Sequence, residues 1–288
     1  MGCVGYGFFK QRGNCMKTCL FTDLDGTLLD NNGIVSDENK AAIKCAIDNG
    51  KRVIICSGRN WRSLEYYEKM LGLDSLGFFG VAYNGGAIYA NKGDSKEFLY
   101  RKMLDKYIAF DLLVDLKQRL ESDMHILVYA NEDRLIAEER VFSTEVYARY
   151  RNLDIIFIDD FLQIQTDFGK ILLYGSFEKL EKARIEMIPK YKGRANIFFS
   201  AHDLLELGPL GVNKGNAIKF LSDYMNIPLD EIIAIGDEAN DIEMLKTAGL
   251  GLAVANATEA AKQAADIIME ESNIQSAVSA AIYKYLLV

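Results

Sequence analysis

Short apolar segments alternate with amphipathic stretches at both ends of this 288-residue chain. Near the N-terminus, apolar segments at 17–22 and 53–56 are separated by a predicted helix over 34–50, and a second helix is predicted over 61–71. After residue 211 the pattern returns, with EIIAIGD and GLAVAN as the apolar segments. Strands that are apolar on both faces are typical of parallel sheets covered by helices on each side. We therefore expect a doubly wound α/β domain formed by the two ends of the chain.

The middle third has a different pattern. Segments 87–91 and 97–101 flank the turn sequence NKGDS as in a β-hairpin, and HILVYAN and DRLIAEE indicate further strands. Hairpins favour an antiparallel sheet with helices on one face, which is an α+β arrangement. We expect an inserted α+β domain over 86–208, between two core segments at 1–85 and 209–288.

Composition excludes several classes of protein. The net charge of −8 and pI near 5.0 argue against nucleic acid or an anionic membrane as the main partner. No apolar run approaches the roughly 18 residues of a membrane helix, and residues 1–15 do not resemble a signal peptide. One hypothesis is that residues 1–15 are a loose extension ahead of a start at Met16. The sequence carries no signal for an oligomeric state.

Cysteine and histidine usage gives two further expectations. The five cysteines are odd in number and match no zinc spacing, and Cys56 lies in an apolar run as a small core residue would. We therefore expect a reducing compartment and a cytoplasmic location. With only two histidines, a catalytic triad or a histidine-rich metal site is not expected.

Two aspartates follow the first apolar strand, in the sequence FTDLDGTLLD. Side chains at i and i+2 of a strand point the same way, so Asp23 and Asp25 are predicted to project together. They lie at the carboxyl end of the strand, where doubly wound sheets bind ligands. Gly26 permits a sharp turn and Thr27 can tie the loop by a hydrogen bond. A solvated Asx turn is the alternative for this pair taken alone.

Three other segments place polar residues where an apolar strand ends or a helix begins. Ser57 and Gly58 suit phosphate oxygens, although Ser-Gly is also a common turn. Arg59, the next residue, is a candidate for substrate contact, but a surface ion pair is the favoured interpretation. Lys214 opens a helix, at a position that favours a lysine only if an anion is nearby; the alternative is a solvated lysine. Asp237 ends the apolar segment EIIAIGD, and Asn240 and Asp241 follow it. They are expected to supply oxygen ligands for Mg²⁺, and the alternative is that they cap a helix.

Together these segments resemble a known family. FTDLDGTLL, ICSGR, GVNKGNAI and GDEANDIEML are similar to motifs I to IV of the haloacid dehalogenase superfamily, and more closely to its Cof-type phosphatases. The resemblance covers nearly all of the chain after Met16. It implies a Rossmann-like core with an inserted cap of the C2B type, and a Mg²⁺-dependent phosphatase acting on small phosphorylated metabolites such as sugar phosphates, nucleotides or phosphorylated cofactors.

The resemblance also implies roles for the motif residues. Asp23 would attack phosphorus to form an aspartyl-phosphate, and Asp25 would act as general acid and then general base. Mg²⁺ would bind the Asp23 carboxylate, the Asp25 carbonyl and Asp237, with Asp241 close by or through water. The phosphoryl oxygens would be held by Ser57, the Gly58 amide, Lys214 and Asn240.

The charge balance supports a cation at this site. Four aspartates and a phosphate dianion would share one pocket with Lys214 as the one obvious cation. Each like-charge pair at ~4 Å costs on the order of 4 kcal/mol at an effective dielectric constant of 20, so one lysine does not offset the total. Mg²⁺ suits all-oxygen ligands and phosphate.

Specificity would reside in the cap. His202, Asp203 and Glu206, near the last cap strand, are candidates for substrate contact, although structural roles on a strand face are equally consistent with the sequence. Two other functions remain open: a phosphomutase on the same scaffold, and a non-enzymatic phospho-acceptor of the receiver type. Asp25 argues against the latter, because a second carboxylate beside the acceptor suits turnover.

Overall fold

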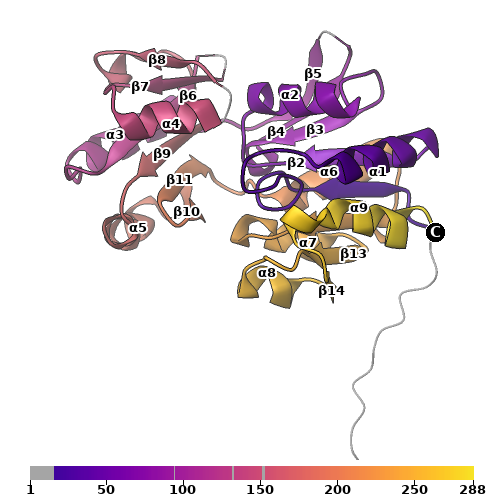
Figure 1. Cartoon of the computed structure of the whole chain (residues 1–288). Coiled ribbons are helices and arrows are strands. Elements are labelled where there is room, and N and C mark those ends of the chain that lie inside the picture. Colours follow the sequence, from indigo (N-terminus) through magenta and orange to yellow (C-terminus); the bar gives the residue numbers. More distant parts are fainter. Residues whose placement is uncertain (1–15, 94, 132, 151–152) are drawn as a thin grey trace, which may run out of the picture.

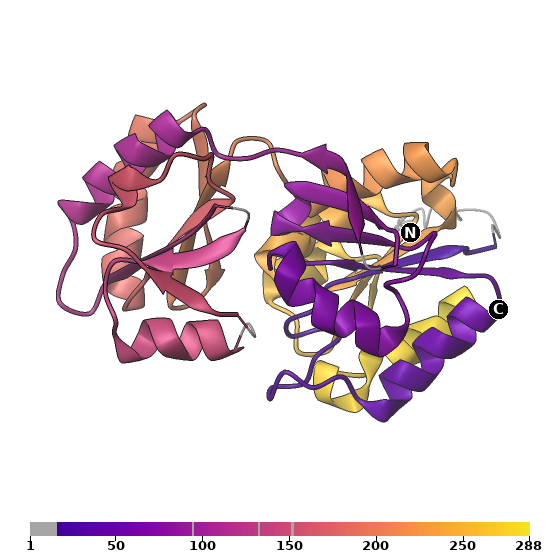
Figure 2. The ribbon, with the colours of Figure 1, turned by 90° about the horizontal axis from the view of Figure 1, so that it is seen from above.

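The computed structural model of the protein describes residues 16–93, 95–131, 133–150 and 153–288 (Figure 1). The hypothesis about residues 1–15, and with it Cys3 and Cys15, lies outside the described residues. The described chain forms two bodies, each built on one sheet, which lie side by side and are joined by two connections (Figure 2). Within it, no helix is long and apolar enough to cross a bilayer.

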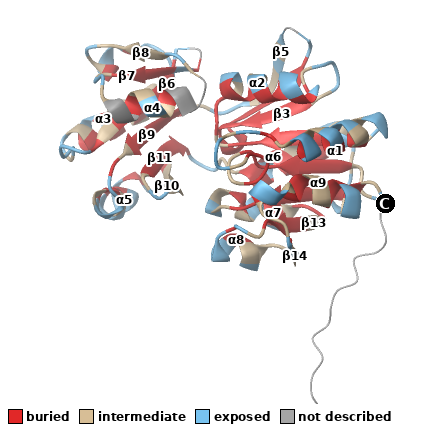
Figure 3. Ribbon diagram, in the orientation of Figure 1, coloured by how far each residue is buried: buried red, intermediate tan, exposed pale blue. Residues whose placement is uncertain are grey.

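The larger body, the core, contains an eight-stranded sheet. Its strands, in spatial order, are β14 (Ile267–Ile268), β13 (Leu250–Ala253), β12 (Ile232–Gly236), β1 (Cys19–Thr22), β2 (Arg52–Cys56), β3 (Phe79–Ala82), β4 (Ala87–Asn91) and β5 (Lys96–Arg101). The strands from β14 to β3 are parallel. The central strands β1, β2 and β12 are buried almost throughout, as their unbroken apolar sequences predict (Figure 3).

Helices cover both faces of the core sheet. The helix α1 (Asp37–Asp48) packs against α2 (Trp61–Leu71) and α9 (Ala277–Ala281) on one face. On the other face α7 (Ile242–Thr247) packs against α6 (Lys214–Met225) and α8 (Glu259–Ala264) (Figure 2). The predicted doubly wound arrangement is therefore confirmed.

The strand register brings three strand ends to one edge of the core sheet. Thr22, the last residue of β1, is paired with Ile55 of β2 on one side and with Ile235 of β12 on the other. Because all three strands run in the same direction, the residues that follow them emerge together. Asp23 and Asp237 therefore directly follow neighbouring strands at the carboxyl edge, although 214 positions of sequence separate them.

The hairpin predicted over 87–101 is present, but it belongs to the core. β4 pairs with β3, and β5 extends the same sheet. The sequence pattern assigns this hairpin to the inserted domain, because a turn sequence between two strand segments does not tell which sheet the hairpin joins. We therefore move our proposed start of the cap, the inserted domain, from residue 86 to about residue 102.

The cap contains a six-stranded sheet. Its strands, in spatial order, are β10 (Ala195–Ala201), β11 (Leu204–Pro209), β9 (Lys170–Tyr174), β6 (His125–Ala130), β7 (Arg134–Ala137) and β8 (Ile155–Phe157). All neighbours are antiparallel except β7 and β8, which α4 (Phe142–Tyr150) connects as a parallel pair. The prediction of a mainly antiparallel cap sheet is confirmed.

The two faces of the cap sheet have different partners. In β6, Ile126 and Val128 pack with α3 (Lys106–Lys117) and α5 (Phe177–Tyr191) in a separate cap cluster. The alternate residues Leu127 and Tyr129 point the other way and join the large cluster that continues into the core. The same alternation applies to β9 and β11, so every second side chain of these strands faces the core.

A buried carboxylate fastens the cap to the core. Asp133, between β6 and β7, is 2% exposed and its backbone φ of 66° is left-handed. Its Oδ2 accepts hydrogen bonds from Trp61 Nε1 at 2.6 Å and Arg101 Nη2 at 2.7 Å, and its Oδ1 accepts one from Tyr83 Oη at 2.9 Å. Its carbonyl oxygen also accepts from Asn60 Nδ2 at 2.8 Å. One cap residue thus satisfies four donors of the core.

We expect Asp133→Ala to destabilise the protein by about 3 kcal/mol. Breaking a buried charge network costs roughly 3–5 kcal/mol, and the lower end applies because the Arg101 side chain is 35% exposed. Urea unfolding measures the change. Asp111→Ala is the matched control, because it breaks a surface pair with Arg194 worth about 1 kcal/mol or less. Equal effects of the two substitutions would contradict the assignment of Asp133 as a fastening residue.

Candidate functional site

Lys214 lies at the centre of the candidate site. It is the first residue of α6 and is fully buried. Its Nζ donates to Asp23 Oδ1 at 2.6 Å and to Asp241 Oδ1 at 2.5 Å. The lysine at the positive end of a helix dipole therefore does meet anions, and these are carboxylates of the protein itself.

The turn after β12 positions two of the aspartates. Asp241 Oδ2 accepts hydrogen bonds from the backbone amides of Asp237 and Glu238, both at 3.0 Å. Asp241 thereby closes the turn with one oxygen and contacts Lys214 with the other. Asp237 is not a helix cap, because its Oδ1 instead accepts from Thr27 Oγ1 at 2.6 Å. Helix capping therefore explains part of the role of Asp241 and none of the role of Asp237.

Gly26 allows the loops after β1 and β12 to approach each other. Its φ is +77°, and a Cβ at this position would clash with the Asp237 carboxylate. A side chain is therefore excluded both by the backbone conformation and by the neighbouring loop. The Thr27 hydroxyl, one residue further on, then reaches Asp237, as the predicted loop-tying role of Thr27 requires.

Three carboxylates form a cluster that has the donor set of a cation site. Asp23, Asp237 and Asp241 are buried, and each places one oxygen within 4.8 Å of the others. Hard divalent cations such as Mg²⁺ bind carboxylate oxygens. The residues present therefore fit a divalent cation.

The electrostatics of the cluster support the same conclusion. Burial raises the pKa of Asp23 to about 7, with Lys214 opposing the shift and Asp241 and Asp25 adding to it. Burial, together with Asp23 and Asp241, raises the pKa of Asp237 to about 9. Burial opposes the charge of Lys214, but Asp23 and Asp241 outweigh it and raise the pKa of this lysine above its usual value. The cluster therefore holds more negative charge than one ammonium group neutralises.

Asp25 does not join this cluster through its side chain. Its carboxylate accepts two hydrogen bonds from Arg59, from Nη2 at 2.5 Å and from Nε at 2.9 Å. Arg59 is 2% exposed, so the surface ion pair that we expected for it from sequence is wrong. A guanidinium that binds both oxygens fixes the orientation of the carboxylate and favours its ionised form.

The loop after β2 lies at the same edge of the core sheet. Ser57 is buried, and its Oγ accepts a hydrogen bond from the Arg59 amide at 3.2 Å. The neighbouring segment after β3 contains Asn84, whose φ of 56° is left-handed. Asn84 Oδ1 accepts a hydrogen bond from Asn240 Nδ2 at 2.9 Å, so the loop that carries Asn240 is tied to the end of β3.

The sequence did not single out Asn84 as a site residue, and for Arg59 it favoured a surface ion pair over a role in the site. Their signals were present, because ICSGR and GVAYNGG each place polar residues directly after an apolar strand. Residues held at positive φ without being glycine are uncommon and occur at functional sites, but the backbone angle of Asn84 is not readable from sequence.

The three predicted cap residues lie at two different places in the structure. Glu206 is 4% exposed and pairs with Lys170 Nζ at 2.7 Å on the core-facing side of the cap sheet. His202 and Asp203 lie at the turn between β10 and β11. The His202 ring stacks on Phe177 of the cap at a centroid distance of 4.7 Å. A substrate-specificity role for these three residues stays a prediction.

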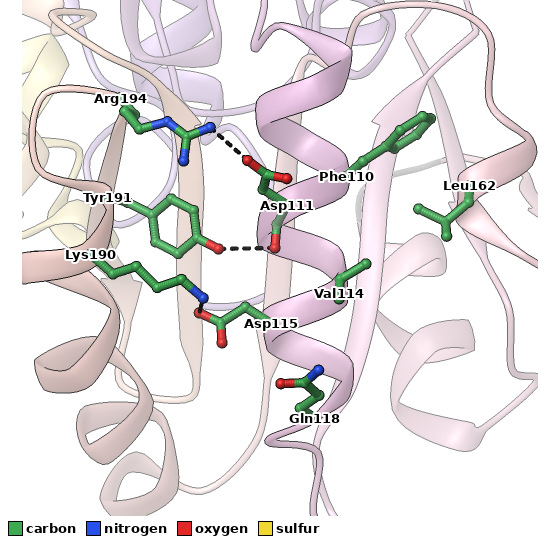
Figure 4. A pocket seen from close by; sticks show the side chains of 9 residues that line it. All are labelled: Phe110, Asp111, Val114, Asp115, Gln118, Leu162, Lys190, Tyr191 and Arg194. Carbon is green, nitrogen blue, oxygen red and sulfur yellow. Dashed lines mark hydrogen bonds and ion pairs between the residues drawn. The ribbon is translucent and has the colours of Figure 1, made fainter.

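A groove on the cap lies apart from these residues. It is lined by Leu162 and by side chains of α3, of the end of α5 and of the turn that follows α5, including Asp111, Asp115, Lys190 and Arg194 (Figure 4). Its charged groups pair with one another: Arg194 with Asp111 at 2.6 Å, and Lys190 with Asp115 at 3.2 Å. Because α3 and α5 cover the face of the cap sheet that is turned away from the core, this groove does not adjoin the carboxylate cluster (Figure 2).

Comparison with known proteins identifies the family. A family model described as haloacid dehalogenase-like hydrolase matches residues 20–282. A haloacid dehalogenase-like hydrolase from Bacteroides thetaiotaomicron superposes with a TM-score of 0.84 at 30% identity, over 93% of this chain and 99% of that one.

Two relatives illustrate the range of the similarity. An HMP-PP phosphatase from Enterobacter sp. (strain 638) is 32% identical over 238 residues, which are 82% of this chain and 83% of the relative. The chloroplastic endoribonuclease YBEY of Arabidopsis thaliana is 33% identical over 275 residues. That match covers 92% of this chain, but the chain spans about half (46%) of the length of that relative.

These matches cover the predicted motif segments and the insertion between them, so the resemblance seen in the sequence is confirmed. They class the chain as a hydrolase of phosphoric monoesters. The chain belongs to the haloacid dehalogenase-like hydrolases, as one of the Cof-type phosphatases.

Proposed function

We propose that this protein is a Mg²⁺-dependent phosphatase that hydrolyses small phosphorylated metabolites through an aspartyl-phosphate intermediate. The observation that carries the proposal is the buried cluster of Asp23, Asp237 and Asp241 around the Lys214 ammonium. A buried excess of carboxylates at the carboxyl edge of a doubly wound sheet suits a cation, and that cation together with Lys214 would suit an anionic substrate. The similarity to an HMP-PP phosphatase supports a phosphorylated small molecule as substrate.

In the first step, an Asp23 oxygen attacks phosphorus and the bond to the leaving alcohol oxygen breaks. Asp25 gives its proton to that oxygen, which leaves as the alcohol, and the phosphoryl group remains on Asp23. Lys214, Ser57, the Gly58 amide and Asn240 hold the phosphoryl oxygens. The ammonium group, the hydroxyl group and the N–H groups of these residues stabilise the negative charge that spreads over the oxygens in the transition state.

In the second step, Asp25 takes a proton from water while the water oxygen attacks phosphorus. The bond to Asp23 breaks, which releases inorganic phosphate and restores the carboxylate. The contact between Arg59 and Asp25 suits this step, because it favours the ionised form that accepts a proton.

A Mg²⁺ ion at this site would be held by Asp23, Asp237 and the Asp25 carbonyl, with Asp241 close by. It would neutralise the surplus carboxylate charge and polarise the phosphoryl oxygens. Both oxygens of Asp241 already accept hydrogen bonds within the protein, which suits a supporting position rather than a direct one.

We expect Asp23→Asn to reduce the hydrolysis of p-nitrophenyl phosphate by at least about 10³-fold, because the amide oxygen is a poor nucleophile. Release of inorganic phosphate is the measurement, and circular dichroism checks that the fold is kept. Asp111→Asn, in an exposed pair of the cap, is the control and should leave the rate unchanged. Retained turnover in the Asp23 variant would remove this residue as the nucleophile. Transfer of phosphate to a second alcohol instead of water would favour the phosphomutase.

Removal of divalent cations with EDTA is expected to abolish turnover, and Mg²⁺ should restore it. Independently of activity, Mg²⁺ at 100 times its Kd should stabilise the folded protein by about 2.7 kcal/mol, measured by thermal unfolding. Asp237→Asn is expected to keep the fold and lose this stabilisation, whereas Asp48→Asn on the exposed face of α1 should keep it. Metal-independent turnover, or equal stabilisation of the Asp237 variant, would contradict a cation at this cluster.

A further inference from the structure

Two charged residues of the cap are buried against the loop that follows β2. Lys170 begins β9 and is 5% exposed, and Glu206 lies in β11 and is 4% exposed. The strand alternation directs both toward the core, on the face that also carries Leu172 and Leu204. Lys170 Nζ contacts Glu206 Oε1 at 2.7 Å and donates to the carbonyl oxygen of Gly58 at 2.8 Å.

The Gly58 carbonyl is one of three in the loop 57–59 that are held by donors. The Ser57 oxygen accepts from the Asn84 amide and the Arg59 oxygen accepts from the Tyr83 amide, both at 2.9 Å. These two donors belong to the core segment after β3. Only the third donor, Lys170, comes from the cap, so among these three contacts the cap supplies the one that is lost when it moves away from the core.

The Lys170 contact affects the side chain of Ser57 through one peptide unit. In a trans peptide the C=O and N–H bonds point in opposite directions. A Gly58 carbonyl that points to Lys170 therefore turns the Arg59 amide the other way, and this amide donates to Ser57 Oγ at 3.2 Å. With an acceptor position of the hydroxyl oxygen filled in this way, the hydroxyl hydrogen remains available for a phosphoryl oxygen.

Glu206 extends the contact to the loop after β12. Its Oε2 accepts a longer hydrogen bond from Asn84 Nδ2 at 3.4 Å, and Asn84 Oδ1 accepts from Asn240 Nδ2 at 2.9 Å. The Lys170–Glu206 pair is thus connected to Ser57 through one peptide and to Asn240 through Asn84. Both end points are residues that we expect to hold phosphoryl oxygens.

The volume of the cavity beside Lys170 and Glu206 indicates whether the pair contacts substrate or positions other residues. A cavity of about 20 Å³ lies next to Lys170, Glu206, Asn84 and Phe198. This volume suits about one water molecule, for which roughly 10–15 Å³ is needed, and it is far too small for the leaving group of a metabolite. In this arrangement the charges of the pair satisfy each other and the core, rather than lining an open subsite.

We propose that Lys170, held by Glu206, is a positioning residue of the cap that orients the phosphoryl-binding loop 57–59 when the cap lies on the core. This inference rests on the proposed phosphatase function. Because the contact exists only with the cap in place, cap closure and phosphate binding favour each other, as linkage between two equilibria requires. Stability alone does not explain such a pair, because buried ion pairs can often be replaced by apolar or neutral groups without loss of stability.

The test compares two buried pairs. Lys170→Met and the double variant Lys170→Met/Glu206→Gln remove the positioning contact, and the double variant leaves no unpaired buried charge. Lys96→Met/Glu68→Gln is the matched control, because Lys96 and Glu68 form a similarly buried pair, with side chains 8% and 1% exposed, that joins β5 to α2. The readouts are kcat/KM for p-nitrophenyl phosphate, inhibition by inorganic phosphate, and calorimetric titration of inorganic phosphate in the presence of Mg²⁺.

We expect both Lys170 variants to lose about 100-fold in kcat/KM, because a small misplacement of binding groups costs about that much. Their affinity for inorganic phosphate should fall at least tenfold, and the control pair should stay within twofold of the wild type in both readouts. If Lys170→Met does not fold, the double variant carries the comparison.

Recovery of wild-type kcat/KM and phosphate affinity in the double variant would show that the pair is only structural, and would overturn the inference while the phosphatase function stands. A wild-type protein without turnover would instead refute the proposed function. The phosphate titration then still decides on Lys170: an affinity that is lowered in the double variant and unchanged in the control supports the positioning role, and equal affinities reject it.

Discussion

The structure depends on a buried ammonium group that two carboxylates share. Lys214 Nζ lies between Asp23 and Asp241, where none of the three side chains is more than 7% exposed. Charges at such a depth persist only when they are paired, so the ends of β1 and β12 and the start of α6 are held in one arrangement. The surplus negative charge makes the same place suited to a divalent cation, which would in turn attract a phosphate, and the catalytic roles that we propose for the neighbouring residues rest on it.

The cap is attached to this site by polar contacts as well as by apolar packing. Asp133 receives donors from the core at one place, and Lys170 donates to the core at another. Directional contacts of this kind define one closed position more sharply than apolar packing does, because they are satisfied only at particular distances and angles.

Local patterns predicted most of the fold. Unbroken apolar strands such as β2 and β12 indicated a parallel sheet covered on both faces, and the polar residues after them indicated the site. The hairpin 87–101 was assigned to the wrong sheet, because its turn sequence is the same whichever sheet it joins. Arg59 was expected at the surface, since arginine is rarely fully buried. The Asp25 carboxylate that binds it lies 34 positions away in the sequence, and no nearby residue indicates this pairing.

The sequence by itself determined which side chains stand at the strand ends, because strand periodicity and turn residues act over a few positions and are readable there. Only the tertiary structure decided which polar groups meet across long separations: Lys170 with Gly58, Asp133 with Trp61, and Asn240 with Asn84. Such pairs depend on strand register and on how two separately folded sheets are set against each other. These are properties of the whole packed chain, and no local segment encodes them.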